Sequence, residues 1–245
     1  MIKEFFHTTV YTPLYNALVG LLSLSDWIDV GIAIIILTVI VKTILFPLSL
    51  KAARTQVILK KIEKPLKEIR EKYKDNREEQ GKKMIELYRE HNVNPFSSFL
   101  VLFIQLPIIL GLYFVFLRGG LPDIDPTLLY GFVTVPENVS MLFFGFVDMA
   151  GKNIPLAILA GVTQHIQARL AMPSSGPRQE NATFQEDFAR SLQTQVKYVL
   201  PFVIMFVAYI ATAAVALYWI TSNIFAIGQE IYVKKKIKTE EVEKE

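Results

Sequence analysis

Lys42 is the residue with the clearest chemical potential, because it is a cation within an otherwise apolar stretch. It follows the apolar run Val30–Val41 and comes about eight residues before the next charge, Lys51, which is roughly 12 Å along a helix. A lysine near the middle of a membrane span costs about 2.5–3.5 kcal/mol to insert. Snorkelling to the interface is the competing interpretation, but the side chain covers only part of that distance. We therefore expect Lys42 to face a water-filled cavity between helices.

Further polar residues lie within other apolar segments, and some are spaced to share a helix face. Gln164 and Gln167 are three residues apart, and Trp219 and Asn223 are four apart, so each pair can share a face. For any one of these residues, interhelical hydrogen bonding is an alternative role. Together with the cation they favour one hydrated cavity. The polar residues singled out on the chain alone are Gln105, Thr163, Gln164, Gln167, Thr212, Trp219, Ser222 and Asn223.

The sequence offers no pattern typical of catalysis or metal binding. It contains no cysteine, and its three histidines are far apart along the chain. Zinc-protease, nucleophile-elbow and phosphate-loop motifs are absent from it. We therefore expect no catalytic residue, no metal site and no cofactor, and we do not expect an enzyme.

The elements that must position these residues are apolar blocks separated by charged segments. Hydrophobic residues make up 52% of the 245, and they gather in blocks of roughly 18–25, long enough to cross the hydrocarbon core as helices. The apolar stretch Val196–Tyr232 has 37 residues, too long for one crossing, so we expect two helices with a turn near Tyr209–Ala213. The prediction is an all-α polytopic membrane protein with five transmembrane helices.

The expected segments follow from these blocks. A short apolar run, Tyr15–Leu24, favours an amphipathic helix lying at the interface, and Met141–Val147 favours a second interfacial segment. In chain order we expect an outer-face interfacial helix in 1–26, spans at 27–50, 96–117, 154–172, 196–210 and 211–233, a cytoplasmic hairpin in 51–95, an outer-face loop in 118–153, a cytoplasmic loop in 173–195 and a charged, solvated cytoplasmic tail in 234–245.

The segment between the first two spans is strongly charged. Lys51–Asn94 holds 13 Lys or Arg and 8 Asp or Glu, with apolar residues at helical spacing. Pro65 suits the first turn of a helix, and Asp75-Asn76 suits a turn between two helices. We therefore expect a charged helical hairpin that stands away from the membrane.

The distribution of Lys and Arg predicts the orientation. The hairpin, the loop before the fourth span and the tail together hold 22 basic residues, whereas the alternate segments hold 3. The positive-inside rule then places the N-terminus outside and the C-terminus in the cytoplasm. The first six residues carry only one Lys and one Glu, so we expect no cleaved signal peptide and a place in a bacterial inner membrane.

Four groups of residues resemble conserved motifs of the YidC/Oxa/Alb membrane protein insertase family, in the right order and over nearly the whole chain. They resemble the shorter bacterial members, which lack the large outer-face domain. The groups are Val41-Lys42-x-Ile44-x-Phe46-Pro47-Leu48, Leu87-Tyr88-x-x-His91-x-Val93-Asn94-Pro95, Ile104-Gln105-x-Pro107-Ile108 with Leu112-Tyr113, and Leu217-Tyr218-Trp219-x-x-Ser222-Asn223.

The resemblance implies a hydrophilic groove that is open to the cytoplasm and to lipid. Family members carry a basic residue there, usually Arg, and Lys42 takes that place, so the charge is kept without the planar five-donor group. The resemblance adds Tyr218 to the groove residues. It implies nascent membrane proteins as substrates, a lipid bilayer as the environment, no nucleotide hydrolysis and no small-molecule substrate. The ribosome and a Sec-type translocon are further candidate partners.

Two other classes of function stay open on the sequence. A small-solute transporter or channel would use Lys42 as a binding charge, and it predicts solute flux without any need for the hairpin. A structural subunit of a larger membrane complex predicts constant stoichiometry with its partners and tolerance of Lys42→Ala. The charged hairpin favours a protein that handles other proteins.

Overall fold

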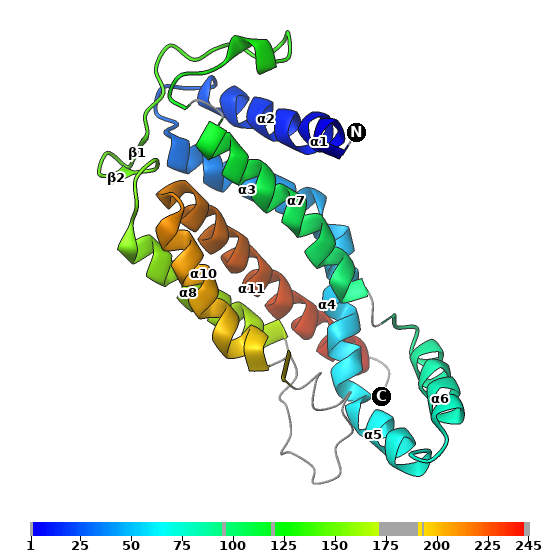
Figure 1. Cartoon of the computed structure of the whole chain (residues 1–245). Coiled ribbons are helices and arrows are strands. Elements are labelled where there is room, and N and C mark those ends of the chain that lie inside the picture. Colours follow the sequence, from blue (N-terminus) through cyan, green and yellow to red (C-terminus); the bar gives the residue numbers. More distant parts are fainter. Residues whose placement is uncertain (1, 95–96, 119–120, 172–190, 193, 243–245) are drawn as a thin grey trace.

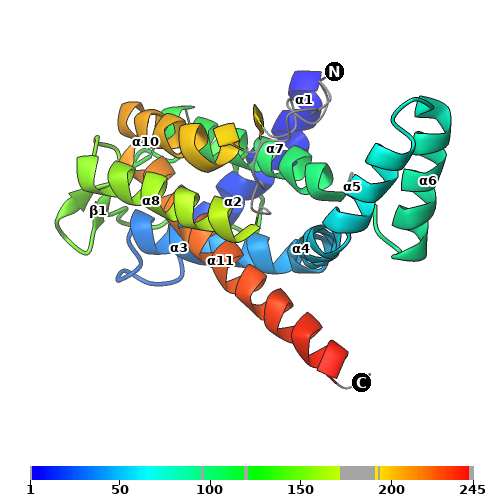
Figure 2. The same ribbon diagram turned by 90° about the horizontal axis from the view of Figure 1, so that it is seen from below.

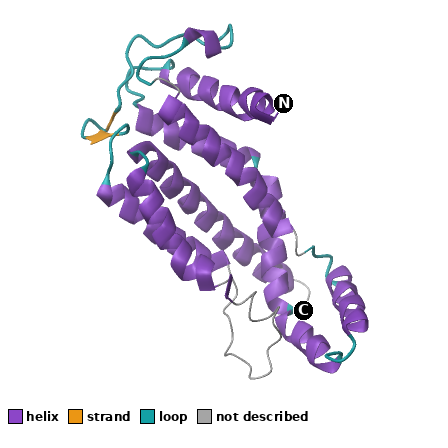
Figure 3. Cartoon of the chain, viewed as in Figure 1, coloured by secondary structure: helices purple, strands orange, loops and turns teal. Residues whose placement is uncertain are grey.

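The computed structural model describes residues 2–94, 97–118, 121–171, 191–192 and 194–242. The described chain forms an elongated helical bundle, with only a small pair of strands at one end (Figures 1 and 3). The predicted all-helical class is therefore confirmed. The expected loop 173–195 lies almost entirely outside the described residues.

The N-terminal segment is a single helical run that is longer than the apolar stretch predicted. It comprises α1 (Ile2–Phe6), the π-helical turn η1 (His7–Tyr11) and α2 (Thr12–Leu22). Its buried face includes Tyr11, Tyr15 and Leu18. This run lies across one end of the bundle, against α3 and α7 (Figure 1).

The first expected span is a bent pair of helices. Helix α3 (Val30–Ile44) begins at Asp29, whose carboxylate accepts a hydrogen bond from the Ile32 amide at 2.8 Å. Helix α4 (Phe46–Lys61) follows after a bend of 67°, and Pro47 lies in its first turn, where a proline is tolerated. The expected boundary at residue 50 is therefore not a helix end.

Among the described residues, no helix on its own combines the length and the apolar composition of a membrane span, whereas α3 and α4 together do so by length and composition.

The charged segment forms a helical hairpin beside the bundle (Figure 2). Helices α5 (Glu63–Lys72) and α6 (Arg77–Glu90) are joined by a turn in which Asn76 caps α6 by accepting from the Glu79 amide. A small core of Ile62, Leu66 and Val93 holds the hairpin together. Its exposed ion pairs, such as Lys82–Glu78, contribute little stability.

After α7 (Ser97–Arg118), a long loop packs over the bundle end that carries α2. It contains the short 3-10 helix η2 (Pro126–Leu128) and two antiparallel strands, β1 (Leu142–Phe143) and β2 (Val147–Asp148). The run Met141–Val147, expected as an interfacial segment, forms most of this hairpin, and Gly145 permits its turn with positive φ. Asn16 fastens the loop to α2 through Leu128 and Tyr130.

The remaining helices form a closely packed group (Figure 1). They are α8 (Ile154–Ala171), the π-helical turn η3 (Gln195–Val199), α10 (Leu200–Ile210) and α11 (Ala213–Val242). The break between α10 and α11 falls at Ala211–Thr212, inside the predicted turn region.

The tail differs from the prediction, because α11 continues as one helix to Val242. The prediction of a solvated or disordered tail from residue 234 was wrong for Ile237, which is buried, whereas Lys235 and Lys236 are exposed. Val233 and Ile237 are buried and pack against Ala53 of α4, and this contact supports the extra turns.

The outer surfaces of the bundle are strongly apolar. On α8, large exposed side chains recur every four residues at Ile154, Ile158, Val162 and Ile166, and Phe202 and Phe206 are exposed on α10. Continuous exposed apolar stripes of this kind mark membrane or partner contacts.

Candidate functional site

Lys42 lies in the last turn of α3 and is half-buried. It is one helical turn beyond Thr38, which is buried and donates to the Ile34 carbonyl at 2.6 Å. The large apolar side chains Val39, Ile40 and Ile44 are instead exposed. Thr38 and Lys42 thus continue the side of α3 that carries the buried residues Val30 and Ile34, whereas the exposed side of its last two turns is mostly apolar. Sequence reasoning missed Thr38, although its spacing of four residues from Lys42 could have identified it.

Asn223 joins α11 to α8 through a buried hydrogen bond. Its side-chain amide donates to Thr163 Oγ1 at 3.2 Å and lies 3.5 Å from the Ala160 carbonyl oxygen. The Thr163 hydroxyl donates within its own helix, to the Leu159 carbonyl at 2.9 Å. Asn223 therefore forms an interhelical hydrogen bond, which was the alternative role considered for it.

The predicted glutamine pair on α8 is brought together. The Gln164 amide donates to Gln167 Oε1 at 3.3 Å; Gln164 is buried and Gln167 is half-buried. The pair adds neutral hydrogen-bonding capacity to a helix that is otherwise mostly apolar.

The α11 candidates differ in burial. Tyr218 and Ser222 are buried, and Tyr218 belongs to the main apolar core. Trp219 is half-buried where the main core meets the cluster formed by α8, α10 and α11. Of the predicted groove residues with described side chains, Lys42, Gln167 and Trp219 are half-buried and the others are buried.

Gln105 belongs to α7, but its side chain is outside the part of the chain that the structure describes. Thr212 precedes α11, and its buried hydroxyl has no hydrogen-bond partner.

A second polar cluster, which sequence reasoning missed, ties α4, α8 and α11 together near the C-terminal half of α11. Gln229 and Ser49 are hydrogen-bonded across the α11–α4 contact at 2.7 Å. Glu230 is buried and pairs with Lys234 at 3.4 Å, and Lys234 also donates to the Leu170 carbonyl of α8. The signal available in the sequence was the pair Gln229-Glu230 within an apolar stretch.

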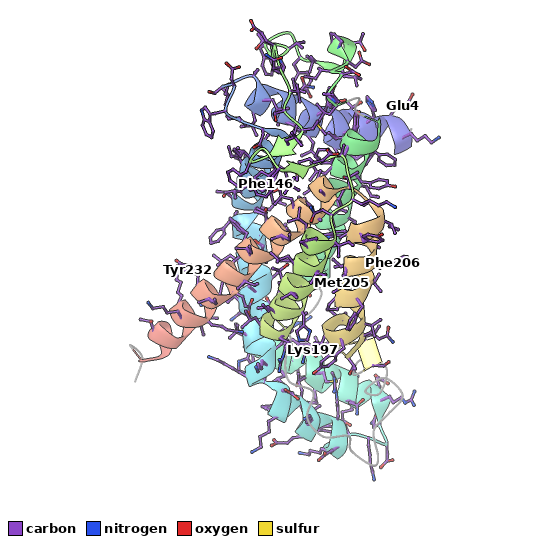
Figure 4. The ribbon with its side chains drawn as sticks, turned by 90° about the vertical axis from the view of Figure 1, so that its left-hand side faces the viewer. Glu4, Phe146, Lys197, Met205, Phe206 and Tyr232 are labelled. Carbon is purple, nitrogen blue, oxygen red and sulfur yellow. The ribbon has the colours of Figure 1, made fainter. Side chains whose placement is uncertain are left out.

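Close backbone packing holds α8 against α10. A Cβ on Gly161 would lie 2.9 Å from Met205 Cε and 3.0 Å from the Pro201 carbonyl oxygen. Met205 lies between the two helices, and Phe206 beside it faces outward (Figure 4). The small residue thus fixes the position of the helix that carries Gln164 and Gln167.

The arrangement offers electrostatic attraction and hydrogen bonding. One ammonium group attracts anionic groups, and amide, hydroxyl and indole groups exchange hydrogen bonds. Within the described ranges, no three His, Asp or Glu side chains gather closely enough to hold a metal ion.

Comparison with known proteins gives matches over most of the chain. Residues 23–241 match the family model of the 60Kd inner membrane protein. The chain is 31% identical over 205 residues to the membrane protein insertase YidC of Clostridium tetani, covering 84% of this chain and 81% of that protein. It is 30% identical over 229 residues to the membrane protein insertase YidC of Fusobacterium nucleatum, covering 93% of this chain and 98% of that protein.

A third relative is much longer than this chain. The match to the membrane protein insertase YidC of Pelobacter propionicus has 30% identity over 207 residues, which is 84% of this chain but 35% of that protein. The chain therefore spans about a third of that relative.

Proposed function

The chain belongs to the family of the 60Kd inner membrane protein, the YidC/Oxa/Alb family, and from this premise we propose that it inserts helices of other proteins into the bacterial inner membrane. The observation that carries the proposal is the match across residues 23–241, together with relatives that are named membrane protein insertases and are covered over most of their length. Its substrates are then nascent membrane proteins.

The proposal includes five membrane crossings, with the N-terminus outside. The crossings are α3 with the start of α4, then α7, α8, η3 with α10, and α11 up to about residue 233. Support comes from the joint length and composition of the α3–α4 pair and from the exposed apolar stripes on α8 and α10. The excess of Lys and Arg in the hairpin supports a cytoplasmic position for it.

We also propose a hydrophilic groove inside the bundle that receives the polar tail of a substrate. The burial of the groove residues supports two different roles for them. Lys42, Gln167 and Trp219, which are half-buried, contact the substrate. Tyr218, Ser222 and Asn223, which are buried, shape the groove wall. Gln105 and Gln164 complete the proposed lining.

The physical task of the groove is to shorten the apolar path for polar groups. Each unsatisfied backbone group costs several kcal/mol in hydrocarbon, so a hydrated groove partway across lowers the barrier for a tail. Lys42 attracts acidic residues of the tail, while neighbouring amides supply hydrogen bonds. The apolar segment then leaves into lipid past α8 and α11. Partitioning into lipid drives this last step, so no nucleotide is consumed.

The membrane potential adds a driving force for acidic tails. It is worth about 2.3 kcal/mol per elementary charge at 100 mV, which is comparable to the cost of placing one charge in the membrane. The charged hairpin of α5 and α6 is the proposed first contact for substrate on the cytoplasmic side.

The test is insertion by the purified protein reconstituted in lipid vesicles. A ribosome-synthesised single-span protein with a short acidic N-terminal tail is added, and protease protection of that tail is scored. The expected result is insertion well above empty vesicles, reduced in Lys42→Ala and retained in Lys42→Arg. Lys152→Ala, which removes a loop lysine lying 5.5 Å from the Tyr209 ring, is the matched control and is expected to insert normally.

Two outcomes would count against parts of the proposal. If folded protein gives no insertion above empty vesicles, autonomous insertion is wrong. If Lys42→Ala inserts as well as the unaltered protein, the function stands and Lys42 has no part in it.

A further inference from the structure

The hairpin of β1 and β2 exposes two phenylalanine side chains at its tip. Phe144 is 66% exposed and Phe146 is 76% exposed, although both belong to a segment, 140–147, that contains no charged residue. The neighbouring Phe143 is instead half-buried and packs against the main core. One aromatic side chain of the hairpin therefore packs against the bundle, and two point away from it.

The backbone at the tip is held in an unusual conformation. Phe144 has a φ of 50° and Gly145 a φ of 80°. Positive φ suits glycine, asparagine or aspartate, and it is unfavourable for a bulky side chain. A strained residue that also exposes a large apolar side chain suggests a functional use rather than a packing requirement.

The hairpin is fixed rigidly to the start of α3. The Phe144 amide donates to Asp29 Oδ2 at 3.0 Å, and the Val30 amide donates to the Ser140 carbonyl at 3.0 Å. A Cβ at Gly31 would collide with the Phe143 ring, so the hairpin lies directly on the helix. Figure 4 places Phe146 at the same end of the bundle as the N-terminal helices.

We propose that Phe144 and Phe146 insert into the outer leaflet of the bilayer and anchor the outer end of the first span at a fixed depth. This inference rests on the membrane placement given under the proposed function, in which α3 begins at the outer interface. Trp and Tyr beside a span end are typical of the lipid interface, and Trp27, which is 68% exposed, lies two residues before Asp29. Phenylalanine is among the residues that interfacial segments bury at the boundary between headgroups and acyl chains. The absence of charge from 140–147 suits lipid and does not suit water.

The test measures the depth of single labelled positions in the reconstituted protein. Because the chain has no cysteine, Phe146→Cys can carry one environment-sensitive fluorophore. Quenching is measured with nitroxide-labelled phosphatidylcholine in the vesicle and, separately, with iodide in the buffer. Glu137→Cys, in the same outer loop and exposed, is the aqueous control, and Phe202→Cys, exposed on α10, is the mid-membrane control.

The expected result is that the Phe146 label is quenched by nitroxides near the headgroups at least several-fold more than the Glu137 label, and is protected from iodide. Phe144→Cys is measured in parallel, so that the conclusion does not depend on one variant. Quenching of both tip labels by iodide to the extent seen at Glu137 would overturn the inference. Quenching by neither agent would also overturn it, because the tip would then be covered by protein.

The Phe202 label separates this inference from the proposed function. If it is quenched by deep nitroxides while the tip labels are not quenched by lipid, the hairpin inference alone fails. If the Phe202 label is itself accessible to iodide, the proposed membrane placement fails, and the hairpin inference fails with it.

Discussion

At the scale of single residues, burial separates the polar side chains that bind other helices from those that have surface left for a ligand. Asn223 and Thr163 are both buried and are joined at 3.2 Å. Lys42 is half-buried, one turn from buried Thr38. Polar residues recur at helical spacing whether they bond another helix or are available to a ligand, so their burial, and not their spacing, distinguishes the two roles.

The bond between Asn223 and Thr163 is expected to contribute measurably to stability. Interhelical hydrogen bonds in membrane bundles contribute about 0.6 kcal/mol on average. A double-mutant cycle with Asn223→Ala and Thr163→Val, measured as the free energy of unfolding in detergent, is expected to give a coupling energy of about that size. Thr221→Val is the control, because the Thr221 hydroxyl bonds the Leu217 carbonyl of its own helix. Strict additivity for the first pair would contradict the assignment.

Tyr15 is expected to ionise at unusually high pH. Burial of its phenol raises the pKa of Tyr15 above the usual value of 10.0, although the hydrogen bond from the Asp125 amide opposes the shift. Because the pKa is higher in the folded state than in the unfolded state, the protonated phenol of Tyr15 stabilises the fold. This contribution to the free energy of unfolding is present below about pH 10 and is lost as the pH rises through the folded-state pKa. The difference in tyrosinate absorbance between the protein and Tyr15→Phe should titrate above pH 10. A midpoint at or below 10 would show that Tyr15 is solvated.

At the scale of elements, small residues set how closely helices approach. Gly161 allows the backbone of α8 to approach Pro201 and Met205 of α10, whereas Gly228 on α11 has no heavy atom within 4 Å of a Cβ position. The two glycines therefore differ in what an added methyl group would meet.

Gly161→Ala is expected to lower the free energy of unfolding by about 1–3 kcal/mol, as overpacking does. The Pro201 carbonyl is backbone and cannot move aside cheaply. Gly228→Ala is the matched control, and it is expected to be neutral or to stabilise by up to about 1 kcal/mol through helix propensity. Thermal or denaturant unfolding in detergent measures both. Equal effects of the two substitutions would mean that α8 and α10 are not in close contact at Gly161.

Elements that depend on neighbouring residues could be predicted from the sequence. Asn76 caps α6 where the turn was expected, and the helix breaks at Ala211–Thr212 within the expected turn. In each case a few adjacent side chains decide the local backbone, so the chain alone carries the information.

Elements that depend on distant contacts could not be predicted. The Asn16 side chain hydrogen-bonds the carbonyl of Leu128, which is 112 residues away, and no local sequence pattern predicts that partner. The extension of α11 beyond Val233 depends on Ile237 packing near Ala53, whereas its charges alone suggested a solvated tail. At the site, Gln164 and Gln167 could be paired from their spacing, but the bond between Asn223 and Thr163 depends on how α8 and α11 pack.

At the scale of the whole molecule, charge and apolar surface are distributed so that one orientation is favoured. The segment 51–94, which contains the hairpin at one end of the bundle, holds 13 of the 26 Lys and Arg residues, while exposed phenylalanines occur at the opposite end in the loop that covers α2. By the positive-inside rule, this distribution supports the proposed cytoplasmic position of the hairpin.

This orientation predicts the labelling of single cysteines in intact bacterial cells that produce the protein. Glu137→Cys should react with a membrane-impermeant maleimide from outside, because the proposed orientation places its loop on that side. Asp75→Cys, exposed at the hairpin turn, should react only after the cells are permeabilised. The reverse labelling pattern would show that the proposed topology is inverted. Labelling of both sites from outside would contradict the proposed topology, because the two segments would then lie on the same side of the membrane.

The central claim, that the polar tail of a substrate occupies the interior of the bundle, is tested most directly by photocrosslinking. A photoreactive phenylalanine analogue is placed at Trp219, which is half-buried, or at Phe206, which faces outward on α10, and a stalled nascent chain with an acidic tail is added to the reconstituted protein. Adducts to the tail are expected from position 219, and few or none from position 206. Equal yields from both positions, or adducts from position 206 alone, would contradict the claim.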